Sequence, residues 1–327
     1  MDSEALFTFV AIHRAGGVSA AADRLSRTQP AISRRLALLE QEIGAPLFER
    51  VAAGVVLSEA GRALLPHAER VLSALRDAET AVHVLRSEAG GPLSLAAVGT
   101  LAGANLTALL RRFAAERPNV ELAIRTATSA EVSDFVRRGD ATIGLRYLLD
   151  PAADLACYSL GTETLRVVCS AEHALAGKSI NSLAKLRAET WFAFPNAYAL
   201  RETYADNIFA QFQRHGIGTI TWRPIDSQSA QKRLIEAGFG LALLAESAIH
   251  DEVRAGTLAV IHVADLHIGN PVYAVTRKGG YLSPSAERLL ALLKEGLPGP
   301  SSPPLSSAKS KRSRSARSRS RGSSSRG

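Results

Sequence analysis

Apolar residues near the start of the chain recur at spacings of three and four positions, which is the pattern of amphipathic helices. One helix is predicted from Glu4 to Ala15, and the glycine pair at 16–17 ends it. Two shorter helices, joined by a tight turn, follow between Val18 and Glu40. Their apolar positions are Val18, Ala21, Ala22 and Leu25 on the first and Ile32, Leu36 and Leu39 on the second.

The second helix of this pair has the features of a helix that enters the major groove of DNA. Thr28 is its expected N-cap, Pro30 is tolerated in its first turn, and Gly44 marks its end. An amide on its outward face could read a base edge, and an arginine could reach a phosphate. That face carries Gln29, Ser33, Arg34 and Arg35. An ordinary helical hairpin with solvated arginines is the plain alternative.

A hairpin and a long helix are predicted next. The segment Leu47–Leu57, with Gly54 near its turn, predicts a hairpin, and three helices with a hairpin form the winged type of helix-turn-helix. Ser58 caps a helix expected over Glu59–Ser87, which Pro66 should kink or distort. The helix has one apolar stripe and no evident core behind it, so we expect it to pair with a copy of itself.

After the linker Gly90-Gly91-Pro92 the pattern changes to alternating strands and helices, which predicts a parallel-sheet α/β region. A first set has strands at Leu93–Val98, Val120–Ala127 and Ala141–Leu145 and helices at Asn105–Glu116 and Glu131–Arg138. A second set has strands at Leu165–Cys169, Trp191–Phe194, Thr219–Arg223 and Gly240–Leu244 and helices at Ser182–Arg187, Ala205–Arg214, Ser229–Ala237 and Ser247–Ala255. A last strand, Val272–Thr276, and helix, Pro284–Lys294, return to the first set. Two such halves leave a cleft in which small ligands bind at the carboxyl ends of strands.

Composition and charge set bounds on this picture. With 327 residues and 46% apolar content, two or three packed domains are expected. The net charge of +8 comes from the segment 298–327, which holds eight basic residues and no acid, while the remaining 31 Lys and Arg balance 31 Asp and Glu. This Ser/Arg-rich tail should be disordered. It is either an arm that adds phosphate contacts to DNA or a dispensable extension.

Other chemistries have little support. No apolar run reaches membrane-spanning length and the start Met1–Glu4 is acidic, unlike a signal peptide, so a cytoplasmic protein is expected. Cys157 and Cys169 are too few for a disulfide framework, and no basic residue stands beside either thiol. The spacing of His262 and His267 suits no common metal signature, so no metal or cofactor is predicted. No P-loop or nucleophile elbow occurs, and an enzyme has no positive support.

The segments SAAADRLSRTQPAISRRLALLEQEIGAPLFER and LSEAGRALLPHA resemble the LysR-type transcriptional regulators closely. Looser matches follow in RRGDATIGLRY, SAEHAL and IEAGFGLALL, so that the resemblance covers roughly residues 3–295. It implies an all-α winged helix-turn-helix unit and two α/β subdomains similar to a periplasmic solute-binding protein. The implied division is a DNA-binding domain at 1–58, a linker and dimerisation helix at 59–89, effector subdomain I at 92–160 and 267–297, subdomain II at 161–266, and the tail at 298–327.

The resemblance also implies which residues meet DNA. Gln29 is the better base reader by chemistry, because its amide can pair with adenine, whereas Arg34 and Arg35 suit phosphate. Arg50 matches the basic position of the wing, but Ala53 stands where a second basic residue is usual, which would shift part of the binding to the tail. The DNA-binding set is Thr28, Gln29, Pro30, Ser33, Arg34, Arg35 and Arg50.

For the effector cleft the resemblance points to residues at strand ends. They are Thr100, Thr126, Thr128, Ser129, Arg146, Phe194 and Asn196. Each has a structural alternative, since such residues also cap helices, form turns or fill a core. An arginine at position 146 would favour an effector with a carboxylate or phosphate. Some family members sense peroxide through a cysteine pair, but packed strand cysteines are the simpler interpretation here.

The function predicted from the sequence is a DNA-binding transcriptional regulator whose ligand alters its grip on an operator. The expected partners are double-stranded DNA, a small-molecule effector that Arg146 would make anionic, a second copy of the chain in a dimer or tetramer, and RNA polymerase. The alternative is a solute-binding module in which the N-terminal helices serve only assembly. Substitution of Gln29 and Arg34 by alanine separates the two.

Overall fold

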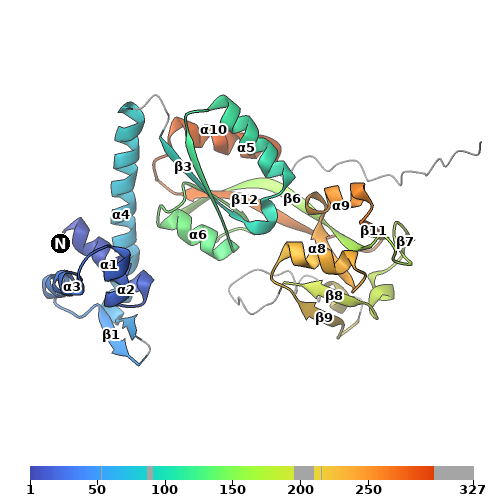
Figure 1. Ribbon diagram of the computed structural model, residues 1–327, viewed down its shortest axis with the longest axis horizontal. Coiled ribbons are helices and arrows are strands. Elements are labelled where there is room, and N and C mark those ends of the chain that lie inside the picture. The colour runs from blue at the N-terminus through green and yellow to red at the C-terminus, as the bar shows by residue number, and fades with distance from the viewer. Residues whose placement is uncertain (53, 87–90, 195–209, 215, 298–327) are drawn as a thin grey trace, which may run out of the picture.

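The computed structural model describes residues 1–52, 54–86, 91–194, 210–214 and 216–297. Its first part is a compact helical unit with a hairpin (Figure 1). The elements are α1 (Ser3–Ala15), α2 (Val18–Arg24), α3 (Gln29–Ile43), β1 (Phe48–Val51) and β2 (Gly54–Leu57). β1 and β2 pair antiparallel, with Phe48 opposite Leu57. The predicted winged helix-turn-helix is therefore present.

The ends of these helices follow the predicted signals. Gly16 and Gly44 adopt left-handed conformations after α1 and α3, with φ of 74° and 80°, which residues with a side chain rarely adopt. The core is formed by residues from all three helices, and the rings of Phe9 on α1 and Phe48 on β1 lie 5.4 Å apart. The hairpin is thus packed onto the helices.

Among the described residues no single helix is both long and apolar enough to cross a membrane. The consecutive helices α1 and α2 reach that length and hydropathy together, but they are bent by 111° and their apolar residues are packed in the core of the unit.

The long helix α4 (Glu59–Arg86) begins at Ser58, whose hydroxyl accepts from the Gly61 backbone N–H at 3.0 Å. It runs through Pro66 without interruption, although the proline removes one backbone donor. Some residues of its apolar stripe are buried and others are exposed. Ala68 and Leu72 pack against α1, whereas Val71, Leu75 and Val82 are 44%, 43% and 51% exposed.

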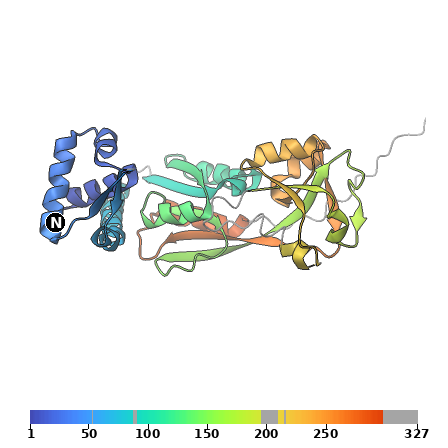
Figure 2. The same cartoon turned by 90° about the horizontal axis from the view of Figure 1, so that it is seen from below.

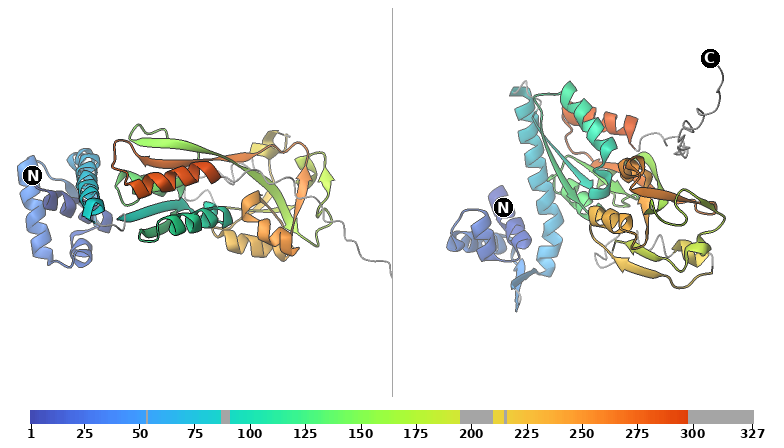
Figure 3. Two further views of the ribbon diagram at one scale, coloured as in Figure 1. Left: turned by 90° about the horizontal axis from the view of Figure 1, so that it is seen from above. Right: turned by 45° about the vertical axis from the view of Figure 1, so that its right-hand side comes forward.

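The rest of the chain is an α/β region built on one extended sheet of order β4-β3-β5-β12-β6-β10-β8-β9, with β11 and β7 beside it. Its first half has β3 parallel to both β4 and β5. Helices α5 and α10 cover one face of this half and α6 covers the other (Figures 1, 2 and 3). The first half consists of β3 (Pro92–Val98), η1 (Gly99–Leu101), α5 (Ala104–Glu116), β4 (Glu121–Ala127), α6 (Ser129–Arg137), β5 (Ile143–Tyr147) and α10 (Pro284–Gly296).

The second half has a hydrophobic core of its own, separate from that of the first half. Strands β8, β9 and β10 are parallel. Its elements are β7 (Ser179–Ile180), η2 (Leu183–Leu186), β8 (Thr190–Ala193), β9 (Thr221–Pro224), α8 (Gln228–Glu236), β10 (Leu241–Ala245), η3 (Glu246–Ala248), α9 (His250–Ala255) and β11 (Leu258–Val263).

Two long strands, β6 (Leu155–Ser170) and β12 (Gly269–Arg277), connect the halves and pair antiparallel with each other. β6 also pairs antiparallel with β10 and β11. The sheet is therefore mixed, and the prediction of a parallel sheet was wrong for these strands. The first part of β6 was missed because its central segment, Gly161-Thr162-Glu163-Thr164, is polar and breaks the apolar pattern. Strands β7 and β11 were missed too.

Smaller differences concern helices of the second half. The helix predicted at 182–187 is a 3-10 turn, and the one predicted at 247–255 is divided into η3 and α9. Of the helix predicted at 205–214, residues 210–214 are helical and 205–209 lie outside the described residues.

Candidate DNA-binding surface and effector site

The leading turn of α3 is exposed. Thr28 occupies the N-cap with φ of −80°, but its hydroxyl makes no capping hydrogen bond. The five polar and proline residues of this surface, Thr28, Gln29, Pro30, Ser33 and Arg34, are all exposed. Ile32 and Leu39 are buried on the opposite side of the helix. The packing therefore presents the predicted base-reading and phosphate-binding side chains to solvent.

Arg35 differs from Arg34. Its guanidinium forms an ion pair with Glu4 of α1 at 2.6 Å, with the two side chains 43% and 62% exposed. An exposed pair of this kind is weak, about 0–1 kcal/mol. Arg35 would have to leave Glu4 to reach a phosphate, so of the two arginines Arg34 is the better placed for DNA.

The wing is held against the end of α3. The Glu40 carboxylate accepts from the Leu47 backbone N–H at 2.7 Å, and the Ser58 hydroxyl donates to the Pro46 carbonyl at 2.6 Å. Arg50 is exposed on β1 beside this anchored turn. Ala53 lies outside the described residues.

A second polar site joins the two α/β halves. Glu163 lies on β6 where this strand passes from one half to the other. Its carboxylate accepts from the Tyr147 hydroxyl at 2.7 Å and from the Ser247 hydroxyl at 2.8 Å. The Thr100 hydroxyl donates to the Tyr147 oxygen at 3.1 Å. We call Thr100, Tyr147, Glu163 and Ser247 the junction network.

The junction network gathers the carboxyl ends of three strands. Thr100 follows β3, Tyr147 ends β5, and Ser247 follows β10 in the second half. Small ligands of α/β proteins bind at such strand ends. Glu163 itself is 8% exposed, and burial raises the pKa of its carboxyl above the usual value, while the hydroxyls of Tyr147 and Ser247 partly oppose that shift.

Arg146 does not take the place expected of it. It is 4% exposed, and its guanidinium pairs with Asp150 at 2.5 Å and donates to the Ser133 hydroxyl at 2.7 Å. Successive side chains of a strand point to opposite faces, so the residue that meets the junction is its neighbour Tyr147. The structure places Arg146 in an internal ion pair with Asp150, and its role in effector binding stays a prediction.

The loop after β4 mostly serves local structure. Thr128 is the N-cap of α6 in a capping box with Glu131. Ser129 is buried and accepts from the Tyr147 backbone N–H at 3.3 Å, so it helps to position Tyr147. Thr126 is exposed on β4 at the edge of the sheet. Phe194 follows β8 and is half-buried, and Asn196 lies outside the described residues.

Of the predicted effector residues, Thr100 is thus the one that the structure brings into the junction network. The sequence analysis missed Tyr147, Glu163 and Ser247. Tyr147 could have been found by extending the predicted strand by two residues. Glu163 had no local signal, because its strand was not predicted.

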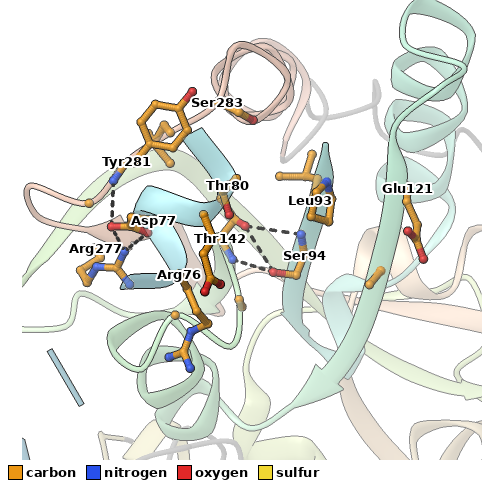
Figure 4. Close-up of a pocket in the computed structure, with 17 residues that line it drawn as sticks. Arg76, Asp77, Thr80, Leu93, Ser94, Glu121, Thr142, Arg277, Tyr281 and Ser283 are labelled. Carbon is orange, nitrogen blue, oxygen red and sulfur yellow. Dashed lines mark hydrogen bonds and ion pairs between the residues drawn. The ribbon is translucent and has the colours of Figure 1, made fainter. Parts of the chain in front are cut away.

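A third polar contact fastens α4 to the first half (Figure 4). Asp77 of α4 pairs with Arg277 of β12 at 2.5 Å and accepts from the Tyr281 backbone N–H at 3.2 Å. These residues border a cavity of about 370 Å³ between α4 and the first half.

Asp140, in the loop after α6, lies close to three guanidinium groups, those of Arg14 on α1, Arg76 on α4 and Arg138 at 3.5, 4.0 and 3.3 Å. The helical unit, α4 and the first half thus meet at polar contacts.

The cysteines both lie on β6. Cys157 and Cys169 are twelve positions apart on this strand, which is roughly 40 Å at the rise of an extended chain, so the two cannot bond within one chain. Burial raises the pKa of the Cys169 thiol to about 11. A reactive thiolate at that position is therefore disfavoured.

Comparison with known proteins places these features in a family. The family model of the bacterial regulatory helix-turn-helix proteins of the lysR family matches residues 3–62, and that of the LysR substrate binding domain matches residues 86–298. The HTH-type transcriptional regulator CbbR of Rhodospirillum rubrum is 30% identical over 291 residues, 88% of this chain and 93% of its own. TfdS of Cupriavidus pinatubonensis is 28% identical over 272 residues, 83% and 91% of the two chains.

Solved structures agree. The full-length LysR-family regulator CbnR in complex with its target DNA superposes with a TM-score of 0.62 at 25% identity, over 90% of this chain and 99% of that chain. A full-length OxyR from Pseudomonas aeruginosa has a TM-score of 0.68 at 20% identity over 90% and 94%, which supports the fold alone. The predicted family, fold class and function are thereby confirmed, and these relatives are regulators rather than enzymes. The chain belongs to the LysR family of transcriptional regulators, with a DNA-binding helix-turn-helix unit joined to an effector-binding unit.

Proposed function

We propose that this regulator reads its operator with the leading turn of α3 and senses its effector at the junction network. The observation that carries the second part is that Glu163 accepts hydroxyl donors from both halves, Tyr147 from the first and Ser247 from the second. A ligand bound there contacts both halves and can favour one angle between them. Such coupling requires that the ligand bind the two geometries with different affinity.

For DNA we assign base reading to Gln29 and phosphate contacts to Ser33, Arg34 and Arg50. Gln29 can make a bidentate bond to adenine from the start of a helix in the major groove. Thr28 and Pro30 would shape the approach of the backbone to DNA. Arg35 contributes after it gives up its pair with Glu4.

We propose that the exposed residues Val71, Leu75 and Val82 of α4 are covered by the same helix of a second copy. Pairing along α4 would give two reading heads for a two-fold symmetric operator. Two such dimers would form a tetramer. RNA polymerase as a partner and a cytoplasmic location are further parts of the proposal, since a transcriptional regulator acts where the chromosome is transcribed.

The predicted division at residues 58, 89, 160, 266 and 297 is retained as a proposal, supported by the separate hydrophobic cores of the two halves. An anionic effector was predicted from Arg146, and the pairing of that arginine with Asp150 removes this support. The tail, 298–327, lies outside the described residues, and its role as an auxiliary DNA-binding arm is a proposal from its charge.

Operator binding tests the assignment of DNA recognition to the leading turn of α3. Gln29→Ala and Arg34→Ala should each abolish selective binding to the DNA upstream of the protein's own reading frame, as measured by fluorescence anisotropy against a scrambled duplex. Arg254→Ala is the matched control, because Arg254 is an exposed arginine on α9 in a surface pair with Asp251. Unchanged selectivity in both α3 variants would contradict the proposal and favour a solute-binding module.

A further inference from the structure

Glu163 is a buried carboxylate that has no cationic partner among the residues that the structure describes. It is 8% exposed, and no arginine or lysine in the described ranges forms an ion pair with it. Removing an ionised carboxylate from water is costly unless a charge compensates it. Two hydroxyl groups provide hydrogen bonds but no positive charge. Within the described part of the chain, the charge of Glu163 is therefore uncompensated whenever its carboxyl is ionised.

The charges on the neighbouring strand ends do not supply this compensation, because they are already paired. Arg146 pairs with Asp150 at 2.5 Å. Arg166, also on β6, pairs with Glu246 at 3.0 Å. The positive N-terminal end of α6 is covered by the Glu131 carboxylate, which accepts from the Thr128 backbone N–H at 2.9 Å.

The hydroxyl protons of the junction network are also directed towards Glu163. Tyr147 and Ser247 donate to its two oxygens, and Thr100 donates to Tyr147. A hydroxyl has a single proton, and in these three groups that proton is already used in a hydrogen bond. A ligand in contact with them would therefore find their oxygens as hydrogen-bond acceptors. Acceptors and a carboxylate match a ligand with N–H donors and repel a ligand carboxylate. Thr100 and Ser247 are half-buried, so the network reaches solvent at both ends.

We propose that the effector of this regulator carries a cationic nitrogen group, an ammonium or guanidinium, which pairs with Glu163 between the two halves. The inference rests on the proposed effector site and reverses the ligand charge predicted from Arg146. The cation supplies the missing charge and keeps Glu163 ionised. The ionised carboxylate in turn strengthens the hydrogen bonds from Tyr147 and Ser247, which joins the halves more tightly.

Matched probes of opposite charge test the proposal on the full chain. Benzylammonium and benzoate have nearly the same shape, and so do butylammonium and butyrate. Binding is measured by calorimetry and by the shift in Tm at millimolar probe, since small fragments bind weakly. The ammonium probes should bind and the carboxylate probes should not. Glu163→Gln should weaken the ammonium probes by at least about tenfold, because it removes the charge of a buried pair.

A control variant and a pH series make the test specific. Glu172→Gln removes an exposed carboxylate elsewhere and should leave probe binding unchanged. Because burial raises the pKa of the Glu163 carboxyl, binding of the ammonium probes to the native chain should tighten as pH rises above the usual range of a glutamate, whereas Glu163→Gln should show no such change. Tyr147 is the titratable group in contact with Glu163, and its hydroxyl donates to the carboxylate.

The outcomes are distinct. Equal or better binding of the carboxylate probes, no binding by either set, or ammonium binding that survives in Glu163→Gln would each overturn the cationic assignment. Operator binding, measured on the same samples, reports on the proposed function separately. Normal operator binding together with failed probe discrimination removes the ligand class and leaves the regulator intact.

Discussion

Glu163 is a buried carboxylate whose ionisation costs stability. Because burial raises the pKa of its carboxyl, the folded state holds the proton more tightly than the unfolded chain does. The stability contributed by this group is complete below the unfolded pKa and is lost as pH rises through the folded pKa. The unliganded protein is therefore less stable at neutral pH than it would be without this charge.

Glu163→Gln should remove that pH dependence. At pH 8 we expect the variant to unfold at a higher urea concentration than the native chain, with a free energy of unfolding larger by on the order of 1 kcal/mol. This difference should shrink towards pH 4.5. Urea unfolding followed by circular dichroism at several pH values measures this. The account would be contradicted if the gain in unfolding free energy of the variant over the native chain were smaller at pH 8 than at pH 4.5.

Arg146 differs from Glu163 because its charge is compensated by Asp150. Arg146→Ala leaves Asp150 buried with one of its two arginine partners lost, and we expect a destabilisation of about 3–5 kcal/mol in urea unfolding. Arg254→Ala, on the surface, should cost within about 0.5 kcal/mol. A stable Arg146→Ala protein with altered ligand binding would restore the original interpretation of this residue.

This pair of neighbours also shows what a single sequence hides. The pattern located the end of β5 near residues 145–147, but not which side chain faces the junction. A shift of one residue along a strand exchanges its two faces. Glu163 was hidden for a related reason, because the polar centre of β6 resembles a turn until its pairing with β12 is known.

At the scale of elements, local signals were enough where a cap or a glycine marks the end. The bounds of α1, α3 and the hairpin agree with the sequence within a residue or two, since Gly16, Gly44 and Ser58 act locally. The two-residue strand β7 was missed because its pairing with β11 depends on a partner that is distant in sequence, and β11, which lies between β6 and β7, was missed as well. The helix-turn-helix unit could thus be predicted, whereas the sequence pointed to Thr100 alone among the residues of the junction network.

The capping box of α6 provides a test at this scale. Thr128→Ala removes the side-chain oxygen that accepts from the Glu131 N–H and should cost about 1 kcal/mol of stability. Probe binding at the junction network should not change, because Thr128 is assigned to capping. Loss of probe binding with unchanged stability would instead return Thr128 to the effector site.

Helix α4 provides a second test at the scale of elements. Leu75→Glu together with Val82→Glu should convert the dimer to a monomer, as measured by light scattering during gel filtration, because both side chains are exposed on one chain. Glu79→Ala, an exchange of a polar residue on the same helix, is the control. A dimer that persists in the double variant would place the interface elsewhere.

At the scale of the whole molecule, α4 links the two functions. Its N-terminal part packs on α1, and its later part is held to the first half by Asp77 and Arg277 (Figure 4). Under the proposed mechanism, a change in the angle between the halves would reach the DNA-binding helices through such contacts. Asp77→Asn should weaken the connection and broaden the distribution of distances between α3 and β3 in spin-label measurements, whereas Glu79→Ala should not. An unchanged distribution would show that the Asp77 pair does not restrain α4.

The central claim, that α3 reads a specific sequence while the tail adds charge alone, is tested most directly by a salt series. Binding to the DNA upstream of the protein's own reading frame is measured for the full chain and for a chain ending at Leu297, which keeps α10 and the buried Leu297 in place. We predict selective binding by both, with a shallower dependence on salt for the shorter chain, because fewer phosphate contacts release fewer counterions. Binding that vanishes with the tail, or that never discriminates between sequences, would contradict the account.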